Sequence, residues 1–512
     1  MSTDLSAQLA DDIITLILDL LGQPGVLAAA GVSRRWRRVA TAHKDFYRSV
    51  TLDRTSTGPY DMRWEPRGIE EYMPALCDEA SDAPKLRVCI ILEQPNGGGV
   101  SLSFTPFGIQ PAQGPLSMCD EMWKELIIPA LELGMSRIVE LDVVIAARYL
   151  PALRDALKEP LPCLRELSIH IDEPGEGEPK WTTYPTLDLG TLSAPLLTTI
   201  SLGNIQLARS APMPHIRNVT LHYSVRNPRS IAVGHLWPNA RSLDFSPPAN
   251  ALDKGGKLSF NLTGMSLQHL CLTYQGEQQW IPRVDKALSL RTIPSIEFVA
   301  KDDGAEVGLL FDGLGQAVSL RIYRDVSDDE VKKAFELTDR NGFVRAFSIG
   351  FWLPSSKLDA AQRQVGTLAN ALVDIRIAHA FLDALFALGT TSFPVLTSIR
   401  IDLEHKRDTE PFWPLAVKPN RDSTSLPTSA PSFDIACPNL TRFVLHDSYQ
   451  VAGVPVDQLL QFAACIRSDA ETRSTGLVLT GVTVPGTHQD LLSRFSSVVH
   501  EEPLVTLTKE GK

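Results

Sequence analysis

LADDIITLILDLLGQPGVLAAAGVSRRWRRVATAHKDFYRSVTL, residues 9–52, is the stretch that decides the fold at one end of this chain. Apolar residues recur at spacings of three and four from Ile13 to Leu21, which predicts a helix with a broad apolar stripe. Gly22 and Pro24 end that helix and begin a second one, because glycine tolerates a left-handed cap and proline fits a first helical turn.

The rest of the stretch predicts a third, short helix. Ser33 is suited to cap it, and Trp36, Val39 and Ala40 would lie on one side while the arginines between 34 and 38 stay in water. Three short helices in about forty residues bury too little surface to be stable alone, since modules of that size usually need a partner. We therefore expect a docking module.

The order of these residues resembles the F-box family. Its pattern is a Leu-Pro start, a Glu-Ile-Leu run, an Ile-Leu pair, a Leu-Leu pair after a turn, Val-Cys-Lys-x-Trp-Arg and a closing Leu-Trp. The matching positions here are Leu9-Ala10, Asp12-Ile13-Ile14, Ile17-Leu18, Val26-Leu27, Val32-Ser33-Arg34-Arg35-Trp36-Arg37 and Phe46-Tyr47. The departures Ala10, Gly31, Ser33 and Tyr47 remove no large apolar anchor.

This resemblance implies the substrate-recognition subunit of an SCF-type cullin RING ubiquitin ligase, whose F-box binds the Skp-type adaptor. It implies adaptor binding, by contact or by the packing beneath, through Leu9, Ile13, Ile14, Ile17, Leu18, Leu21, Leu27, Val32 and Trp36. One alternative is a three-helix start that packs on its own domain. Another is a non-catalytic scaffold that binds the adaptor outside a ubiquitin ligase.

The composition indicates a globular protein. The 512 residues are 44% hydrophobic, enough for one large domain or two to three ordinary ones. The net charge of -11 argues against a nucleic-acid partner, whose binding site is usually basic. There is no signal peptide and no apolar run near the roughly 18 residues of a membrane span, so we expect a protein of the cytoplasm or nucleus.

Residue patterns for enzyme or metal chemistry are missing from the sequence. The seven cysteines are odd in number and contain no Cys-x-x-Cys pair, so we expect reduced thiols, no disulfide framework and no metal site. There is no phosphate-binding glycine loop, nucleophile elbow or zinc-binding helix motif, so no catalytic residue or cofactor is predicted. An enzyme with an unrecognised site is the alternative, and a deep polar pocket would reveal it.

From about residue 137 the chain carries a repeated pattern: proline, any residue, apolar, two residues, apolar, one residue, apolar. The six copies are Pro162-Leu164-Leu167-Ile169, Pro195-Leu197-Ile200-Leu202, Pro214-Ile216-Val219-Leu221, Pro238-Ala240-Leu243-Phe245, Pro394-Leu396-Ile399-Ile401 and Pro438-Leu440-Phe443-Leu445. The last two apolar residues are two apart, so they would point the same way from a short strand that follows the proline.

The same apolar triplet also recurs without the proline. These copies are Ile138-Leu141-Val143, Leu267-Leu270-Leu272, Ala317-Leu320-Ile322, Val344-Phe347-Ile349 and Leu372-Ile375-Ile377, with a frayed copy at Pro294-Ile296-Val299. Most copies lie roughly 19 to 33 residues apart, which brackets the period of a leucine-rich repeat. The asparagine that usually follows each strand in such repeats is mostly missing, with Asn204 and Asp447 as candidates.

The repeats resemble the irregular leucine-rich repeats attached to many F-boxes, notably in fungal chains. The resemblance implies an α/β fold: an F-box at 1–52, a connecting segment at 53–136, and a solenoid with a parallel sheet at 137–512. Helices are expected at 149–157, 327–337, 378–388 and 456–466, and Ser327 with Glu330 has the spacing of a capping box. An ordinary α/β domain with a parallel sheet would share much of this pattern.

The connecting segment and two insertions complete the chain. Residues 84–92 predict a buried strand, 95–115 an irregular loop, and 121–133 a helix that Pro129 would kink or divide. The insertions at 172–186 and 404–432 should be exposed loops, where recognition often occurs. Candidate contacts to the unknown target protein are Trp181, Tyr184, Phe412 and Trp413. Linkers without a role, or aromatics folded back onto the repeats, are the alternatives.

Overall fold

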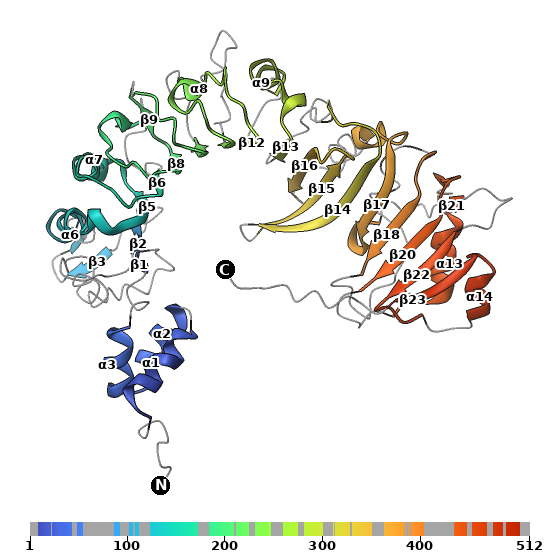
Figure 1. The fold of residues 1–512 in the computed structure, drawn as a ribbon, viewed down its shortest axis with the longest axis horizontal. Helices are drawn as coiled ribbons and strands as arrows, with labels where there is room; N and C mark the ends of the chain where they lie inside the picture. Colours follow the sequence, from blue (N-terminus) through green and yellow to red (C-terminus); the bar gives the residue numbers. More distant parts are fainter. Residues whose placement is uncertain are drawn as a thin grey trace. The chain divides into compact units, whose positions relative to one another are not determined.

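In the computed structural model the chain divides into two compact units, Met1–Ser266 and Leu267–Lys512 (Figure 1). The structure describes residues 9–21, 23–43, 49–54, 86–92, 102–105, 108–111, 123–172, 184–208, 211–224, 231–246, 260–274, 281–300, 311, 313–327, 330–350, 363–382, 385, 388, 390, 392–403, 435–447, 453–467, 475–484 and 488–501. Both units combine helices and strands, and a large, mostly parallel sheet dominates this α/β chain.

The first unit begins with the three expected helices. They are α1 (Asp11–Asp19), α2 (Gln23–Ala30) and α3 (Arg34–Thr41). Ser33 caps α3 as the sequence predicts, since its side-chain oxygen accepts a hydrogen bond from the N–H of Trp36 over 3.3 Å. This satisfies one of the N–H groups that a helix start leaves without an internal partner.

A parallel sheet forms most of the rest of the first unit. Its strands pair in the order β1 (Ser49–Arg54), β2 (Leu86–Leu92), β5 (Ile138–Ile145), β6 (Glu166–Ile171), β8 (Thr199–Gly203), β10 (Asn218–His222) and β11 (Ser242–Ser246). The buried strand predicted at 84–92 is confirmed as β2. Because β1 and β2 belong to this sheet, it begins upstream of residue 137, where the sequence places the start of the repeats.

Helices connect several of these strands, as Figure 1 shows for α6 and α7. A π-helix at Trp123–Ile127 continues into α6 (Ile128–Gly134), and Pro129 stands in the first turn of α6, so the helix predicted to kink or divide at this proline changes its type just before it. The helix α7 (Leu150–Ala156) confirms the one expected at 149–157.

The prediction of an irregular loop at 95–115 is wrong, because β3 (Leu102–Thr105) and β4 (Gly108–Pro111) pair there as a hairpin. The remaining elements are α8 (Val233–Leu236), β7 (Thr186–Leu187) and β9 (Gln206–Leu207).

The six proline copies share one local geometry. Each proline begins a turn, and the N–H two residues later donates to the carbonyl just before the proline, as from Leu164 to Leu161 over 3.2 Å and from Leu440 to Cys437 over 3.1 Å. Proline suits this second turn position because its φ is fixed and it has no N–H to lose. The apolar pair that follows is buried on the strand in every copy. The pattern read from the sequence therefore marks a turn and the strand after it.

The second unit contains a mixed sheet. Its order is β12 (His269–Tyr274), β13 (Ser295–Ala300), β16 (Val344–Gly350), β15 (Glu330–Thr338), β14 (Val318–Ser327), β17 (Leu372–Ala378), β18 (Ser398–Asp402), β20 (Arg442–His446), β22 (Gly476–Thr480) and β23 (Ser497–Glu501). All neighbours are parallel except β15, which runs antiparallel to both strands beside it.

The helix predicted at 327–337 is wrong, because this segment forms the hairpin of β14 and β15. Ser327 stands directly opposite Glu330 across the two-residue connection of that hairpin. A capping box and the closing pair of such a hairpin have the same spacing of three residues, so this signal alone could not distinguish them. Phe335 and Leu337 are buried from the strand β15.

One repeat copy is also shifted. In β13 the buried pair is Ile296 and Phe298, whereas Val299 lies on the other face, so the copy predicted at Pro294-Ile296-Val299 has the wrong last residue. The remaining elements of the unit are α9 (Ile281–Leu288), α13 (Val456–Ala464), α14 (His488–Leu492), β19 (Ile435–Ala436) and β21 (Ile466–Arg467). The helix α13 confirms the one expected at 456–466. A 3-10 turn, His379–Phe381, begins the segment expected to be helical at 378–388.

Candidate docking surface

The three N-terminal helices have a small core of their own. Ile14 and Leu18 of α1, Val26 of α2, and Val39 and Ala40 of α3 are buried together. Ala29 and Ala30 complete this core, and Leu9 and Trp36 pack against its margin. The apolar side of α3 is therefore the side that the sequence predicts.

Polar contacts fasten the first helix to the third. The carboxylate of Asp11 accepts hydrogen bonds from Nε of Arg35 over 2.7 Å and from a terminal nitrogen of Arg38 over 2.6 Å. The hydrogen bond from Arg35 is the main reason that the pKa of Asp11 lies below its ordinary value. At the other end of α1, Nε2 of His43 lies 3.2 Å from Oδ1 of Asp19. Two of the arginines expected only to be in water thus hold the module together.

Large apolar side chains remain exposed on the far side of α1. Ile13, Leu16 and Leu20 are 43%, 59% and 87% exposed, and they lie at positions i, i+3 and i+7, so they share one face of the helix. Leu21 and Val32 are also exposed. These five side chains are half of the ten large apolar side chains that are exposed among the described residues, so exposed apolar surface is concentrated here. We call Ile13, Leu16 and Leu20 the apolar stripe.

The nine residues expected to bind an adaptor fall into four groups. Ile13, Leu21 and Val32 are exposed, and Leu9, Ile17 and Trp36 are partly buried. Ile14 and Leu18 are fully buried, so their role is the packing beneath the surface and not direct contact. Leu27 lies in α2, and its side chain is outside the described part of the structure, as are the closing residues Phe46 and Tyr47. Leu16 and Leu20 are not among the expected residues, although their spacing from Ile13 places them on the same stripe.

One of the four aromatic residues expected to contact a target lies within the described residues. Tyr184 is only 5% exposed, and its ring centroid lies 5.4 Å from that of Tyr223, so it folds back into the core, which is the alternative that the sequence left open. Trp181, Phe412 and Trp413 lie outside the described residues.

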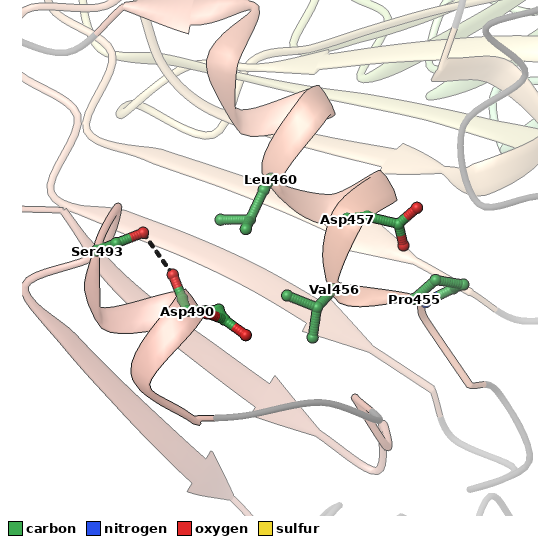
Figure 2. A pocket seen from close by; sticks show the side chains of 6 residues that line it. All are labelled: Pro455, Val456, Asp457, Leu460, Asp490 and Ser493. Atoms are coloured by element: carbon green, nitrogen blue, oxygen red, sulfur yellow. Dashed lines mark hydrogen bonds between the residues drawn. The ribbon is translucent and has the colours of Figure 1, made fainter.

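A groove between α13 and α14 is the pocket that Figure 2 shows. It is lined by Pro455, Val456, Asp457, Leu460, Asp490 and Ser493. Val456 and Leu460 of α13 point toward the α14 segment, where the Ser493 hydroxyl donates to the carbonyl oxygen of Asp490 over 2.6 Å. The groove is shallow, and the hydroxyl of Ser493 in its lining donates to a backbone carbonyl and not to a carboxylate, so it is not the deep polar pocket that would reveal an enzyme.

His170 comes nearest to a catalytic arrangement. Its Nε2 lies 3.1 Å from the hydroxyl of Ser201 on the next strand, and burial lowers its pKa despite the field of Asp142. The ring rests over Gly203, where an added Cβ would lie 2.1 Å from Nδ1. Among the described residues no three His, Cys, Asp or Glu side chains are arranged to hold a metal ion.

Comparison with models of known protein families gives no match, and no curated protein matches the chain. Within the ranges that the structure describes, no helix is both long enough and apolar enough to cross a membrane. The functional assignment therefore depends on the residues of the chain itself.

Proposed function

We propose that this chain is the substrate-recognition subunit of an SCF-type cullin RING ubiquitin ligase. Residues 9–43 are an F-box that binds a Skp-type adaptor, and the sheet-forming remainder is an irregular leucine-rich-repeat solenoid that binds the target protein. The observation that carries this proposal is the apolar stripe of Ile13, Leu16 and Leu20, which lies outside a three-helix core that is already filled.

The energetics of the stripe favour a partner. Fully burying a leucine or isoleucine side chain contributes about 1.5–3 kcal/mol, so covering the three side chains gives a substantial driving force for association. Because Ile14 and Leu18 already fill the core of the module, folding alone does not bury the stripe. A second protein surface that supplies apolar pockets would do so, which is the usual reason for an exposed patch of this kind.

Asn204 supports the repeat half of the proposal. This buried residue follows β8, and its amide nitrogen donates to the carbonyl of Ile171 over 2.9 Å. Its side-chain oxygen accepts from the backbone N–H of Ser224 over 3.0 Å, so it bonds the last residue of β6 and the segment that follows β10. An asparagine that bonds turn backbones after a strand is the expected feature of a leucine-rich repeat. Asp447 lies buried at the corresponding position after β20.

In this proposal the chain supplies no catalytic group or cofactor. Binding a target lysine beside the ubiquitin-loaded enzyme raises the effective concentration of the reacting groups and makes the transfer effectively intramolecular. The exposed apolar stripe supports a binding role for the chain. The ligase components place such a protein in the cytoplasm or the nucleus.

The proposal is tested by affinity purification of the full chain followed by mass spectrometry. A variant with Leu16→Ser and Leu20→Ser should lose the adaptor and cullin but retain target proteins, because both side chains are exposed and leave the core intact. Truncating a central anchor typically costs 2 kcal/mol or more, about thirtyfold in affinity. Leu133→Ser is the matched control, since Leu133 of α6 is 48% exposed but lies outside the module.

Other outcomes separate the alternatives. If the unaltered chain captures neither adaptor nor cullin, the proposal is wrong. If it captures the adaptor without cullin, the chain is a scaffold that uses the adaptor outside a ubiquitin ligase. If the Leu133→Ser control loses as much adaptor and cullin as the stripe variant does, the loss of binding is not specific to the apolar stripe.

A further inference from the structure

Two histidines stand in one row across three parallel strands of the first unit. His170 of β6 is directly opposite Gly203 of β8, which is directly opposite His222 of β10. Each histidine alternates with buried apolar residues of its strand, so both imidazoles lie on the face of the sheet that points away from the core. We call His170, Gly203 and His222 the histidine row.

The two imidazoles are closer to each other than their strands are. Neighbouring strands are about 4.8 Å apart, so β6 and β10, which have β8 between them, are about 9.6 Å apart. The ring centroids of His170 and His222 are nevertheless only 6.5 Å apart, with 35° between the ring planes. The rings therefore converge in the space above β8.

Glycine at position 203 makes this approach possible. A Cβ there would lie 2.1 Å from Nδ1 of His170 and 2.7 Å from its Cγ, so any other residue would displace the ring. Nδ1 is the ring atom nearest to that position. It therefore lies over the strand that separates the two histidines.

The other ring nitrogen of His170 has a partner, since Nε2 lies 3.1 Å from the hydroxyl of Ser201. When Nε2 carries the proton and donates it to Ser201, Nδ1 keeps its lone pair, and metal-binding histidines are oriented by such a bond from the second nitrogen. Burial lowers the pKa of His170, although the charge of Asp142 acts in the opposite direction, so the imidazole is neutral at neutral pH. Neutral imidazole is the form that binds metal ions.

A hydroxyl beside the histidine row lacks a partner. Ser246 of β11 stands directly opposite His222 and is only 5% exposed. Its Oγ is buried and has no hydrogen-bond partner in the part of the chain that the structure describes. A buried hydroxyl of this kind indicates a bound water molecule or ion nearby.

We infer that His170 and His222 bind one divalent transition-metal ion, zinc, above Gly203, with water in its remaining coordination positions. Imidazole suits zinc, and Zn–N bonds are about 2.0–2.1 Å long, so two imidazoles on one tetrahedral zinc ion have ring centroids about 5.2 Å apart. Closing the observed 6.5 Å to that separation needs a movement of about 1.3 Å, which the partly buried side chain of His222 can supply.

The site is open. No three His, Cys, Asp or Glu side chains of the described residues surround one position, so its affinity should be lower than that of a closed structural zinc site. The ion would tie β6 to β10 across β8 and stabilise the first unit, because a ligand that binds only the folded chain favours folding. This role requires neither an adaptor nor a target protein.

The test measures the zinc content of the full chain. The chain is stripped of metal with a chelator and dialysed against micromolar zinc chloride, and bound zinc is measured by inductively coupled plasma mass spectrometry. His222→Gln should bind about one zinc ion fewer per chain than the unaltered protein. This variant leaves the contact between His170 and Ser201 in place.

His269→Gln is the matched control. Nδ1 of His269 lies 3.0 Å from the hydroxyl of Ser295, directly opposite on the next strand, so this pair repeats the contact between histidine and serine. The next residue in that row is Val344 and not a second histidine. The control should therefore bind as much zinc as the unaltered chain.

A second measurement uses the unaltered chain, so it stays decisive if a variant fails to fold. Diethyl pyrocarbonate modifies accessible imidazoles, and peptide mapping gives the rate for each histidine. Zinc should slow the modification of His222 severalfold but not that of His269, and His170→Gln should remove this protection. Equal zinc contents of His222→Gln and the control overturn the inference, as does equal protection of His222 and His269 in the unaltered chain.

Discussion

The carboxylate of Asp11 joins the first helix to the third, since it accepts a hydrogen bond from Nε of Arg35 over 2.7 Å. Asp11→Asn should therefore loosen α3 from α1 and speed amide hydrogen exchange in α3. Asp12→Asn is the matched control, because Asp12 is the exposed neighbour in the same helical turn. Equal exchange in the two variants would contradict a fastening role for Asp11.

The same contact predicts a dependence on pH and salt. The hydrogen bond from Arg35 lowers the pKa of Asp11 below its model-compound value of 3.8, so the carboxylate is fully charged at neutral pH. The charged carboxylate stabilises the contact between α1 and α3 fully at pH values above the pKa of the unfolded chain. This stabilisation is lost as the pH falls through the lower pKa of the folded protein. Because both side chains are partly exposed, salt should also weaken the contact. Exchange in α3 should rise with added salt in the unaltered chain and much less in Asp11→Asn.

Asn204 is predicted to be a strong determinant of stability in the first unit. Asn204→Ala removes hydrogen bonds to Ile171 and Ser224 and places alanine at a φ of 55°, a left-handed conformation that asparagine tolerates better. Together these effects should cost about 2–4 kcal/mol. The midpoint of thermal unfolding should fall by several degrees. Asn218→Ala, at an exposed strand position, should change it little, and equal shifts would contradict the prediction.

The ring of His170 on the neighbouring strand leaves no room for a side chain at position 203, so we predict that only glycine fits there. A Cβ at position 203 would lie 2.1 Å from Nδ1 of that ring, so Gly203→Ala should destabilise the first unit by about 1–3 kcal/mol. Adding His170→Ala should recover most of this loss, because the ring is the obstacle. A double-mutant cycle on thermal unfolding measures the coupling, and additive effects would contradict the predicted contact.

The sequence predicts the strands well where a local signal marks them. Each of the six prolines stands in a turn that leads directly into a strand, as β6 follows Pro162, so the proline and the apolar spacing after it mark the strand. The hairpin of β14 and β15 has no such marker, and Ser327 with Glu330 suits either a helix start or a tight connection. Short-range spacing cannot choose between them, because the choice depends on which strands lie alongside.

The candidate sites were predictable only in part for a related reason. Residues 13–21 are apolar on most sides, so the sequence predicts the helix but not that Ile14 faces inward and Leu16 outward. The placement of Arg321 of β14 opposite Arg376 of β17, and of Arg376 opposite Arg400 of β18, could not be predicted, because the three residues are far apart in the sequence. Only the register of three strands brings them together.

Cys437 is predicted to resist alkylation in the folded protein. Its side chain is fully buried beside the turn of the last proline copy, and burial raises the pKa of its thiol to about 12. At pH 8 only about one thiol in 10⁴ would then be the reactive thiolate. Iodoacetamide should label the partly exposed Cys163 in the native chain well before Cys437, whereas both should react in denaturant. Peptide mapping by mass spectrometry measures both labelling rates. Equal labelling of the two cysteines in the native chain would contradict the prediction and show that the second unit opens at the turn that holds Cys437.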